Sequence, residues 1–131
     1  MTHDKLAWLI AVGFTCISVM GCNPVKQPRG KRLLDQMVAT MEQSVEVLSS
    51  IKDEKSARAA KPKLEKLMQE YRRMSEEFQS TPPPPKEEYD RGTKRLRELD
   101  KQIWEAKDQY RRLAQRNPEV KAILDPILGN P

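Results

Sequence analysis

The sequence predicts an all-α protein: an antiparallel three-helix, coiled-coil-like bundle followed by a short C-terminal helical segment. In three separate segments, apolar residues recur at alternating intervals of three and four, which is the period of left-handed helix packing. The period of two that marks a strand is absent. Aromatic residues make up only 5% of the 131 residues and charged residues 33%. The apolar residues therefore suffice for narrow seams between helices and not for a wide globular core.

Before the bundle, residues 1–21 have the composition of an export signal. The stretch from 6 to 19 is apolar except at Thr15 and Ser18, and Lys5 precedes it. The apolar region of a signal is typically about 7–15 residues long, whereas a membrane-spanning helix takes about 20. We therefore expect this segment to direct export.

The signal ends in Val19-Met20-Gly21-Cys22, which resembles the lipobox of bacterial lipoproteins. In that family an aliphatic residue stands three positions before the cysteine and a small residue directly before it. The resemblance covers residues 1–22 alone. It implies a diacylglyceryl group on the Cys22 sulfur, cleavage before this residue, and acylation of the new amino terminus. Such a set of lipid chains anchors a protein stably in a membrane.

Lipidation of Cys22 would hold the chain at a cell membrane, on its extracytoplasmic side. The alternative is an uncleaved membrane anchor with an incidental cysteine, which gives the same side. Asn23 stands where the sorting pattern of bacterial lipoproteins often has the aspartate that retains them at the inner membrane. In a bacterium with two membranes, the resemblance therefore implies the outer membrane, facing the periplasm.

Residues 22–30 are expected to be a flexible tether, because they include two prolines and a terminal glycine and have little to bury. The eight residues after Cys22 reach about 27 Å when fully extended, at roughly 3.4 Å per residue. The helical bundle, expected at residues 31–128, would then stay close to the bilayer.

The first two helices are expected at residues 31–51 and 54–80. A polar run separates them, and either Asp53 or Ser56 can cap the second helix. Pro62 leaves two alternatives: the second helix starts just before it, or one helix runs through it with a kink. The seam residues are Leu34, Val38, Met41, Val45 and Leu48 in the first helix, and Ala57, Ala60, Leu64, Leu67, Tyr71, Met74 and Phe78 in the second.

A proline-rich loop at residues 81–85 precedes the third helix, expected at residues 86–116. Four successive prolines, from Pro82 to Pro85, forbid a helix and favour a stiff polyproline II link. Gly92 is the one seam position of the third helix without an apolar side chain. The other seam residues are Tyr89, Leu96, Leu99, Ile103, Ala106, Tyr110 and Leu113.

A last helix is expected at residues 118–125. Asn117 is a suitable N-cap and Pro118 a suitable first helical residue, and Pro126 is expected to interrupt the helix. A segment this short is not stable as an isolated helix in water, so it must dock on the bundle.

Trp104 lies one position off the third seam, among charged neighbours. One interpretation is structural: the C-terminal segment folds back over the ring, or arginine stems pack on it. The other is functional: Trp104, with Arg97 and Arg111, contacts a partner, because tryptophan and arginine are frequent interface anchors.

The composition does not favour an enzyme. The only histidine, His3, and one of the two cysteines fall in the signal, and Cys22 is expected to carry lipid. The sequence has no metal-ligand cluster and no glycine-rich phosphate loop, so we expect no catalytic residue, metal or cofactor. The net charge is +5, but acidic residues interrupt each basic cluster, and no nucleic acid is expected as a partner.

The heptads and the lipobox together resemble the architecture of small helical envelope lipoproteins such as murein lipoprotein. That family attaches to peptidoglycan through a C-terminal lysine, whereas this sequence ends in Gly129-Asn130-Pro131, so this attachment is not expected.

The sequence predicts a membrane-anchored lipoprotein of the bacterial cell envelope that acts as a structural or protein-interaction module. Its partner would be an envelope protein or a second copy of the chain. The alternative is a carrier or regulator for a lipid or small ligand in the periplasm, a role suggested by the seam methionines. These are Met37, Met41, Met68 and Met74.

Overall fold

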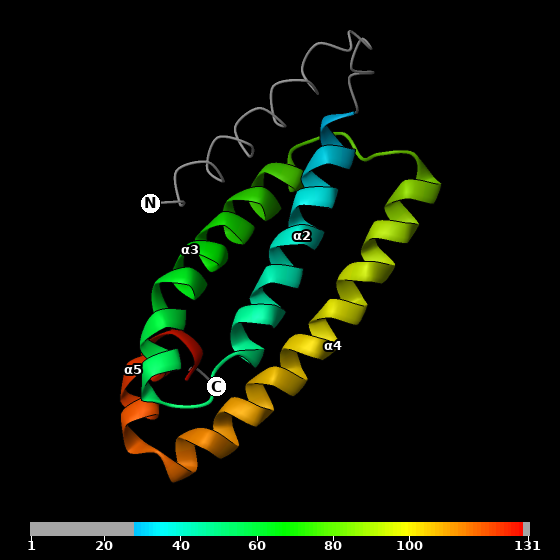
Figure 1. Cartoon of the computed structure of the whole chain (residues 1–131). Coiled ribbons are helices and arrows are strands. Elements are labelled where there is room, and N and C mark those ends of the chain that lie inside the picture. The colour runs from blue at the N-terminus through cyan, green and yellow to red at the C-terminus, as the bar shows by residue number, and fades with distance from the viewer. Residues whose placement is uncertain (1–27, 130–131) are drawn as a thin grey trace, which may run out of the picture.

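The computed structural model describes residues 28–129, which form four α-helices and, within this range, no strand. Three are long: α2 (Arg29–Ser49), α3 (Glu54–Gln79) and α4 (Lys86–Arg116). The short α5 (Pro118–Leu128) lies at the end of the molecule where α4 finishes (Figure 1). The all-α prediction is therefore confirmed.

The expected signal at residues 1–21, the lipidation site Cys22 and most of the expected tether lie outside the described residues. Among the described helices, none has the length and apolar character needed to cross a membrane.

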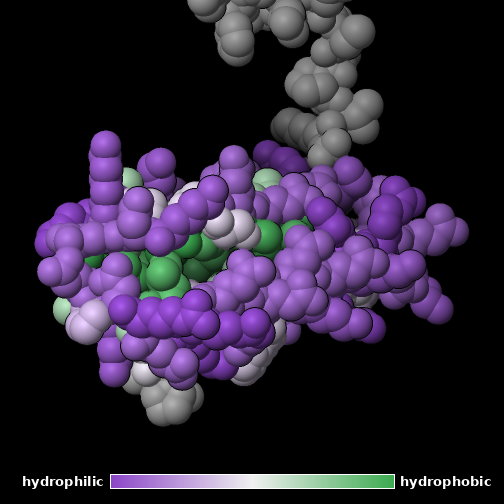
Figure 2. Space-filling model, turned by 60° about the horizontal axis from the view of Figure 1, so that its bottom comes forward, coloured by the Kyte–Doolittle hydropathy of each residue, from purple (hydrophilic) through white to green (hydrophobic). Residues whose placement is uncertain are grey.

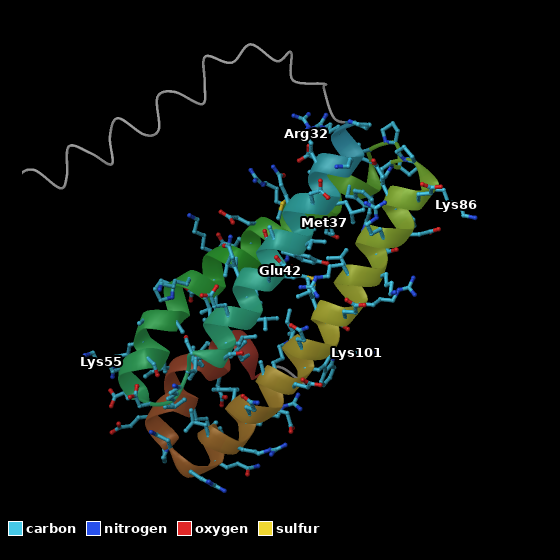
Figure 3. The ribbon with its side chains drawn as sticks, turned by 45° about the vertical axis from the view of Figure 1, so that its right-hand side comes forward. Arg32, Met37, Glu42, Lys55, Lys86 and Lys101 are labelled. Atoms are coloured by element: carbon cyan, nitrogen blue, oxygen red, sulfur yellow. The ribbon has the colours of Figure 1, made fainter. Side chains whose placement is uncertain are left out.

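The central helix is α2, which packs on α3 along one side and on α4 along the other (Figure 1). The chain reverses direction between successive long helices, so Lys55 and Lys86, near the N-terminal ends of α3 and α4, lie at opposite ends of the molecule (Figure 3). Along their described lengths, no Cα atom of α3 comes within 8 Å of a Cα atom of α4. The two helices are connected by side chains and by α5, which contacts both of them.

A capping box starts α3. The Asp53 carboxylate accepts a hydrogen bond from the Ser56 N–H at 2.8 Å, and the Ser56 hydroxyl accepts one from the Asp53 N–H at 3.0 Å. Both candidate caps are thus used together, which satisfies two N–H groups that the first turn would otherwise leave unpaired. The helix then continues through Pro62, so the alternative of a start at this proline is wrong. Pro62 lies on the exposed side, where water can bind the carbonyl that loses its partner.

The N-terminal end of α2 differs from the prediction. Residues 29 and 30, expected in the flexible tether, belong to the helix, and Gly30 is buried. Gly30 faces the proline loop: a Cβ atom at this position would lie 2.6 Å from the Pro82 carbonyl oxygen and 3.2 Å from the Pro84 ring. Pro84 is buried as well. The loop and the start of α2 therefore pack closely, and they can do so because residue 30 has no side chain.

The helix α5 ends three residues later than expected, because Pro126 does not interrupt it. Its N-cap is the predicted one: the Asn117 side chain accepts hydrogen bonds from the N–H groups of Glu119 and Val120, at 3.2 and 3.3 Å. Pro126 lies on the exposed face of the helix. The opposite face, with Val120 and Leu124, is fully buried and holds the last turn in place.

Most of the buried core residues belong to two clusters. The first, near the proline loop, contains Leu33, Met37 and Met74, with Tyr71, Phe78 and Leu96 packed against it. The second, at the α5 end, is larger; its buried members are Leu48, Ala57, Ala60, Leu64, Ala106, Tyr110, Ala114, Val120 and Leu124. Most of these are predicted seam residues. Leu33 and Thr40 are buried although they lie off the predicted seam, because α2 has a neighbour on each side and so buries a broader stripe.

Gly92 has a packing role in the third seam. A Cβ atom at this position would overlap the side chain of Leu34, which is 2% exposed. The glycine therefore lets α4 approach α2 closely, and the apparent gap in the apolar pattern is a contact between helices.

The substitution Gly30→Ala tests the packing of the proline loop. We expect it to lower the free energy of unfolding by about 1–3 kcal/mol, the usual cost of overpacking. The new methyl group would press on the backbone oxygen of Pro82, which has no rotamer to change. Urea denaturation followed by circular dichroism measures the effect. Arg32→Ala, at an exposed position of the same helix, is the control and should change the stability by no more than about 0.5 kcal/mol. A Gly30→Ala protein as stable as the wild type would contradict the packing described.

Candidate interaction groove

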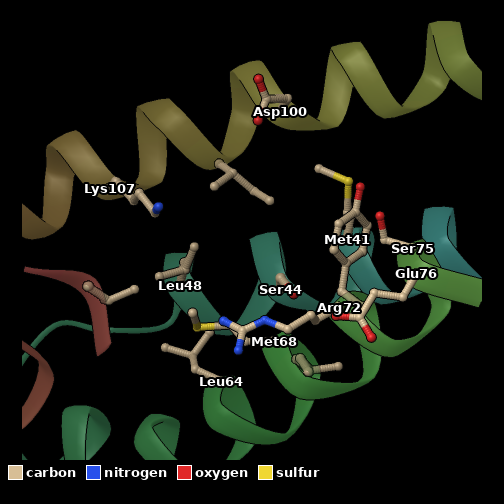
Figure 4. A pocket seen from close by; sticks show the side chains of 14 residues that line it. Met41, Ser44, Leu48, Leu64, Met68, Arg72, Ser75, Glu76, Asp100 and Lys107 are labelled. Carbon is tan, nitrogen blue, oxygen red and sulfur yellow. The ribbon is translucent and has the colours of Figure 1, made fainter. Parts of the chain in front are cut away.

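An apolar groove lies between α3 and α4, with α2 as its floor (Figure 4). We call it the α3–α4 groove; its volume is about 470 Å³. On the face of the molecule shown in Figure 2, an apolar hollow lies between hydrophilic rims, as expected for such a groove. Its apolar lining residues are Met41, Leu48, Leu64, Leu67, Met68, Tyr71, Ile103 and Leu128.

The groove coincides with the break between the two core clusters. On α2, Met41 and Ser44 lie between Met37 of the first cluster and Leu48 of the second, and both line the groove. The Ser44 hydroxyl donates a hydrogen bond to the Thr40 carbonyl at 2.8 Å, so its donor is already used within the helix. The middle of the floor is thus effectively apolar.

Side chains close the gap between α3 and α4 at both ends. Near the proline loop, the rings of Phe78 and Tyr89 stack with their centroids 6.4 Å apart and an angle of 12° between their planes. At the other end α5 lies against both helices, and Leu128 at its end lines the groove. The aromatic stack and α5 therefore bridge α3 and α4 beyond the two ends of the groove.

Four charged residues line the groove: Arg72 and Glu76 on α3, and Asp100 and Lys107 on α4 (Figure 4). Within residues 28–129, none of the four forms an ion pair. Burial raises the pKa of the Tyr71 phenol, and the negative charge of Asp100 raises it further. Tyr71 on α3 and Asp100 on α4 line the groove from opposite walls.

Trp104 lies on the same side of α4 as the groove. It is four residues after Asp100 and three before Lys107, and residues at these spacings share a helix face. Its side chain is 58% exposed. The guanidinium carbon of Arg111 lies 5.6 Å from the centroid of the indole ring, a cation–π contact that helps to fix the ring.

The structure therefore separates the possibilities considered for Trp104. The expectation that the C-terminal segment covers the ring is wrong, because α5 buries its apolar face in the second core cluster instead. Packing of an arginine on the ring is found, with Arg111 as the residue. Arg97, the other candidate partner contact, is exposed seven residues before Trp104, two turns away on the same side of the helix.

Three large hydrophobic side chains are exposed within the described part of the chain: Met68, Tyr89 and Trp104. Met68 is 44% exposed on the α3 wall of the groove. Trp104 stands on the α4 side, and Tyr89 belongs to the stack that closes one end. Of the three, Met68 alone lines the groove, and Trp104 lies beside its α4 wall, next to the lining residues Asp100 and Lys107 on the helix surface. Of the four methionines singled out from the sequence, Met41 and Met68 line it, whereas Met37 and Met74 are buried in the first core cluster.

The position of α5 depends on Tyr110, which is 4% exposed. Its hydroxyl donates a hydrogen bond to the Asp125 carboxylate at 2.9 Å and so ties α5 to α4. Burial raises the pKa of this phenol well above its ordinary value, and the bond to Asp125 raises it further.

Among residues 28–129, no group of three or more His, Cys, Asp and Glu side chains is placed to hold a metal ion. No family model, curated protein or solved structure matches the chain.

The groove itself could not be predicted from the seams. Each seam indicates that a helix packs on a neighbour, but it does not indicate which pair of helices stays apart. The only signals were single unusual residues, such as Met68 and Trp104.

The substitution Tyr110→Phe tests the link between α4 and α5. We expect it to lower the free energy of unfolding by about 0.5–1.5 kcal/mol near neutral pH, the usual net value of a hydrogen bond. The unfolded chain ionises this phenol near its ordinary pKa of 10.0, whereas the folded protein keeps it neutral. The stabilisation from Tyr110 is therefore complete below pH 10 and is lost as the pH rises above this value.

The measurement is urea denaturation of both proteins at several pH values on either side of 10. The wild type should lose stability more steeply than Tyr110→Phe on the alkaline side, so that the difference between the two shrinks. Parallel curves would show that Tyr110 ionises equally easily in the folded and unfolded states.

Proposed function

We propose that this chain is a lipid-anchored helical lipoprotein of the bacterial cell envelope and acts as a protein-interaction module. One observation carries the interaction role: the α3–α4 groove presents an apolar floor, the exposed Met68 on its α3 wall with the exposed Trp104 beside its α4 wall, and wall charges that form no ion pair within residues 28–129. Exposed apolar patches with polar rims are typical of interaction sites. The anchor is inferred from the lipobox at Cys22.

In this proposal the three long helices work as an antiparallel bundle with one open seam. The contacts of α2 with α3 and with α4 hold the bundle together, and the seam between α3 and α4 is left for the partner. The site binds and does not catalyse, so no metal or cofactor is required. The module faces the extracytoplasmic side, at the outer membrane of a two-membraned bacterium, where nucleic acid is not an expected partner.

A second candidate is a carrier or regulator for a lipid or small ligand. The volume of the groove, about 470 Å³, falls within the range of roughly 300–1,000 Å³ that small-molecule sites occupy. The flexible side chains of Met41 and Met68 in its lining can adapt to an apolar ligand. The lack of a deep enclosure makes this candidate the weaker one.

The lipid anchor is tested by the intact mass of the protein extracted from membranes with detergent. We expect a chain that starts at Cys22 and carries a diacylglyceryl group and one further acyl chain. A Cys22→Ala protein should lack this mass and stay uncleaved. An unmodified full-length chain in the soluble fraction would refute the anchor and the location together.

The interaction role is tested by a photoreactive amino acid placed in intact cells at position 104 or at position 68. We expect one persistent protein adduct at both positions. The same probe at positions 102 and 69, which are exposed but lie on other faces of α4 and α3 than positions 104 and 68, should not give it. Lipid adducts without a protein adduct would favour the carrier.

A further inference from the structure

The chain already places a helix between α3 and α4. The short α5 contacts both helices and lies in the gap between them at one end of the molecule. It buries Val120 and Leu124, spaced four residues apart, in the core cluster that α3 and α4 share there. This spacing is that of an amphipathic helix presenting one face. The α3–α4 groove begins where α5 ends, since Leu128 of its last turn lines the groove.

The dimensions of the gap also suit a helix. Helices in direct contact have axes about 8–10 Å apart, whereas the backbones of α3 and α4 stay further apart than such packing requires along their described lengths. A helix laid over the opening would touch both walls, as α5 does. Its large side chains would pack on Met41 of the floor and on Ile103 of the α4 wall.

The charges of the groove favour a peptide over a fatty acid. Each wall carries one charge of each sign, Arg72 and Glu76 on α3 and Asp100 and Lys107 on α4. A fatty acid needs a cationic site for its single carboxylate, and the acids close to each cation weaken such a site. The polar positions of an amphipathic helix, in contrast, can supply both signs.

We propose that the α3–α4 groove binds an amphipathic helix of a partner protein, which continues the track of α5 along the gap. Met68 on the α3 wall and Trp104 beside the α4 wall are its main contacts, and the partner presents apolar residues at i, i+3 or i+4, and i+7. This inference rests on the interaction role proposed above and names the chemistry of the partner. It does not depend on the lipid anchor.

The test uses the full chain carrying Trp8→Phe, which leaves Trp104 as its single tryptophan. The probe is a labelled synthetic peptide of about 18 residues, long enough to form a helix on docking. It consists of leucine, alanine, glutamate and lysine, with leucine at alternating intervals of three and four. A second peptide has the same composition with its leucines spread evenly around the helix. We expect saturable binding of the first peptide alone, with a blue shift of the Trp104 emission as the ring is covered.

Matched substitutions locate the binding site. Met68→Glu should weaken binding about tenfold or more, as expected for a residue that contributes strongly to an interface. Gln69→Glu places the same charge at the neighbouring exposed position outside the groove and should leave binding unchanged. Trp104→Ala and Gln102→Ala form a second pair on α4, measured by the anisotropy of the labelled peptide. Circular dichroism of each variant confirms that the helices are intact.

Several results would overturn the proposal. These are equal binding of the two peptides, no binding of either, or equal effects of Met68→Glu and Gln69→Glu. Displacement of the peptide by palmitate at one molecule per chain would assign the groove to a lipid. A dimer that Met68→Glu dissociates would assign it to a second copy. Peptide binding by a protein that is not lipidated would refute the anchor alone. Lipidation of a protein that does not bind the peptide would refute only this inference.

Discussion

The two-sided packing of α2 is the constraint on which the rest of the structure depends. Because α2 buries residues toward both α3 and α4, each outer helix is held by the middle one and needs no backbone contact with the other. Two glycines make this arrangement tight: Gly92 lets α4 approach Leu34, and Gly30 lets the proline loop lie on the start of α2. The groove follows from the same constraint, since the side of α2 that neither outer helix covers becomes its floor.

The sequence predicted the helices well because their signals are local. Alternating intervals of three and four mark the seams, Asp53 and Asn117 mark helix starts, and four prolines mark the loop. Two of the helix ends that differ from the prediction have a physical reason: Gly30 and Pro126 discourage a helix by intrinsic preference, yet packing on the proline loop and on the second core cluster overrides that preference. The first helix also ends two residues earlier than predicted, at Ser49.

The candidate site could be predicted only in fragments. Trp104 and the methionines stood out as unusual residues, but nothing in the sequence links position 68 with position 104. That link depends on how far apart α3 and α4 lie, which is a property of the whole fold. The position at which α5 docks on the bundle could likewise not be predicted. A short apolar segment must dock somewhere, and only the structure shows that its apolar face meets Tyr110 and Ala114 and leaves the indole exposed.

The position of the proline loop limits the distance between the helical bundle and a membrane that holds Cys22. The loop lies at the same end as the start of α2 (Figure 1), and the seven residue-to-residue steps from Cys22 to Arg29 span at most about 24 Å. With lipid on Cys22, this end of the bundle would lie within about 24 Å of the bilayer surface. At 1.5 Å per residue, α2 is about 30 Å long, so the α5 end lies about that far from the proline loop along the bundle. The tether and the bundle together would therefore limit how far from the membrane a helix bound in the groove can lie.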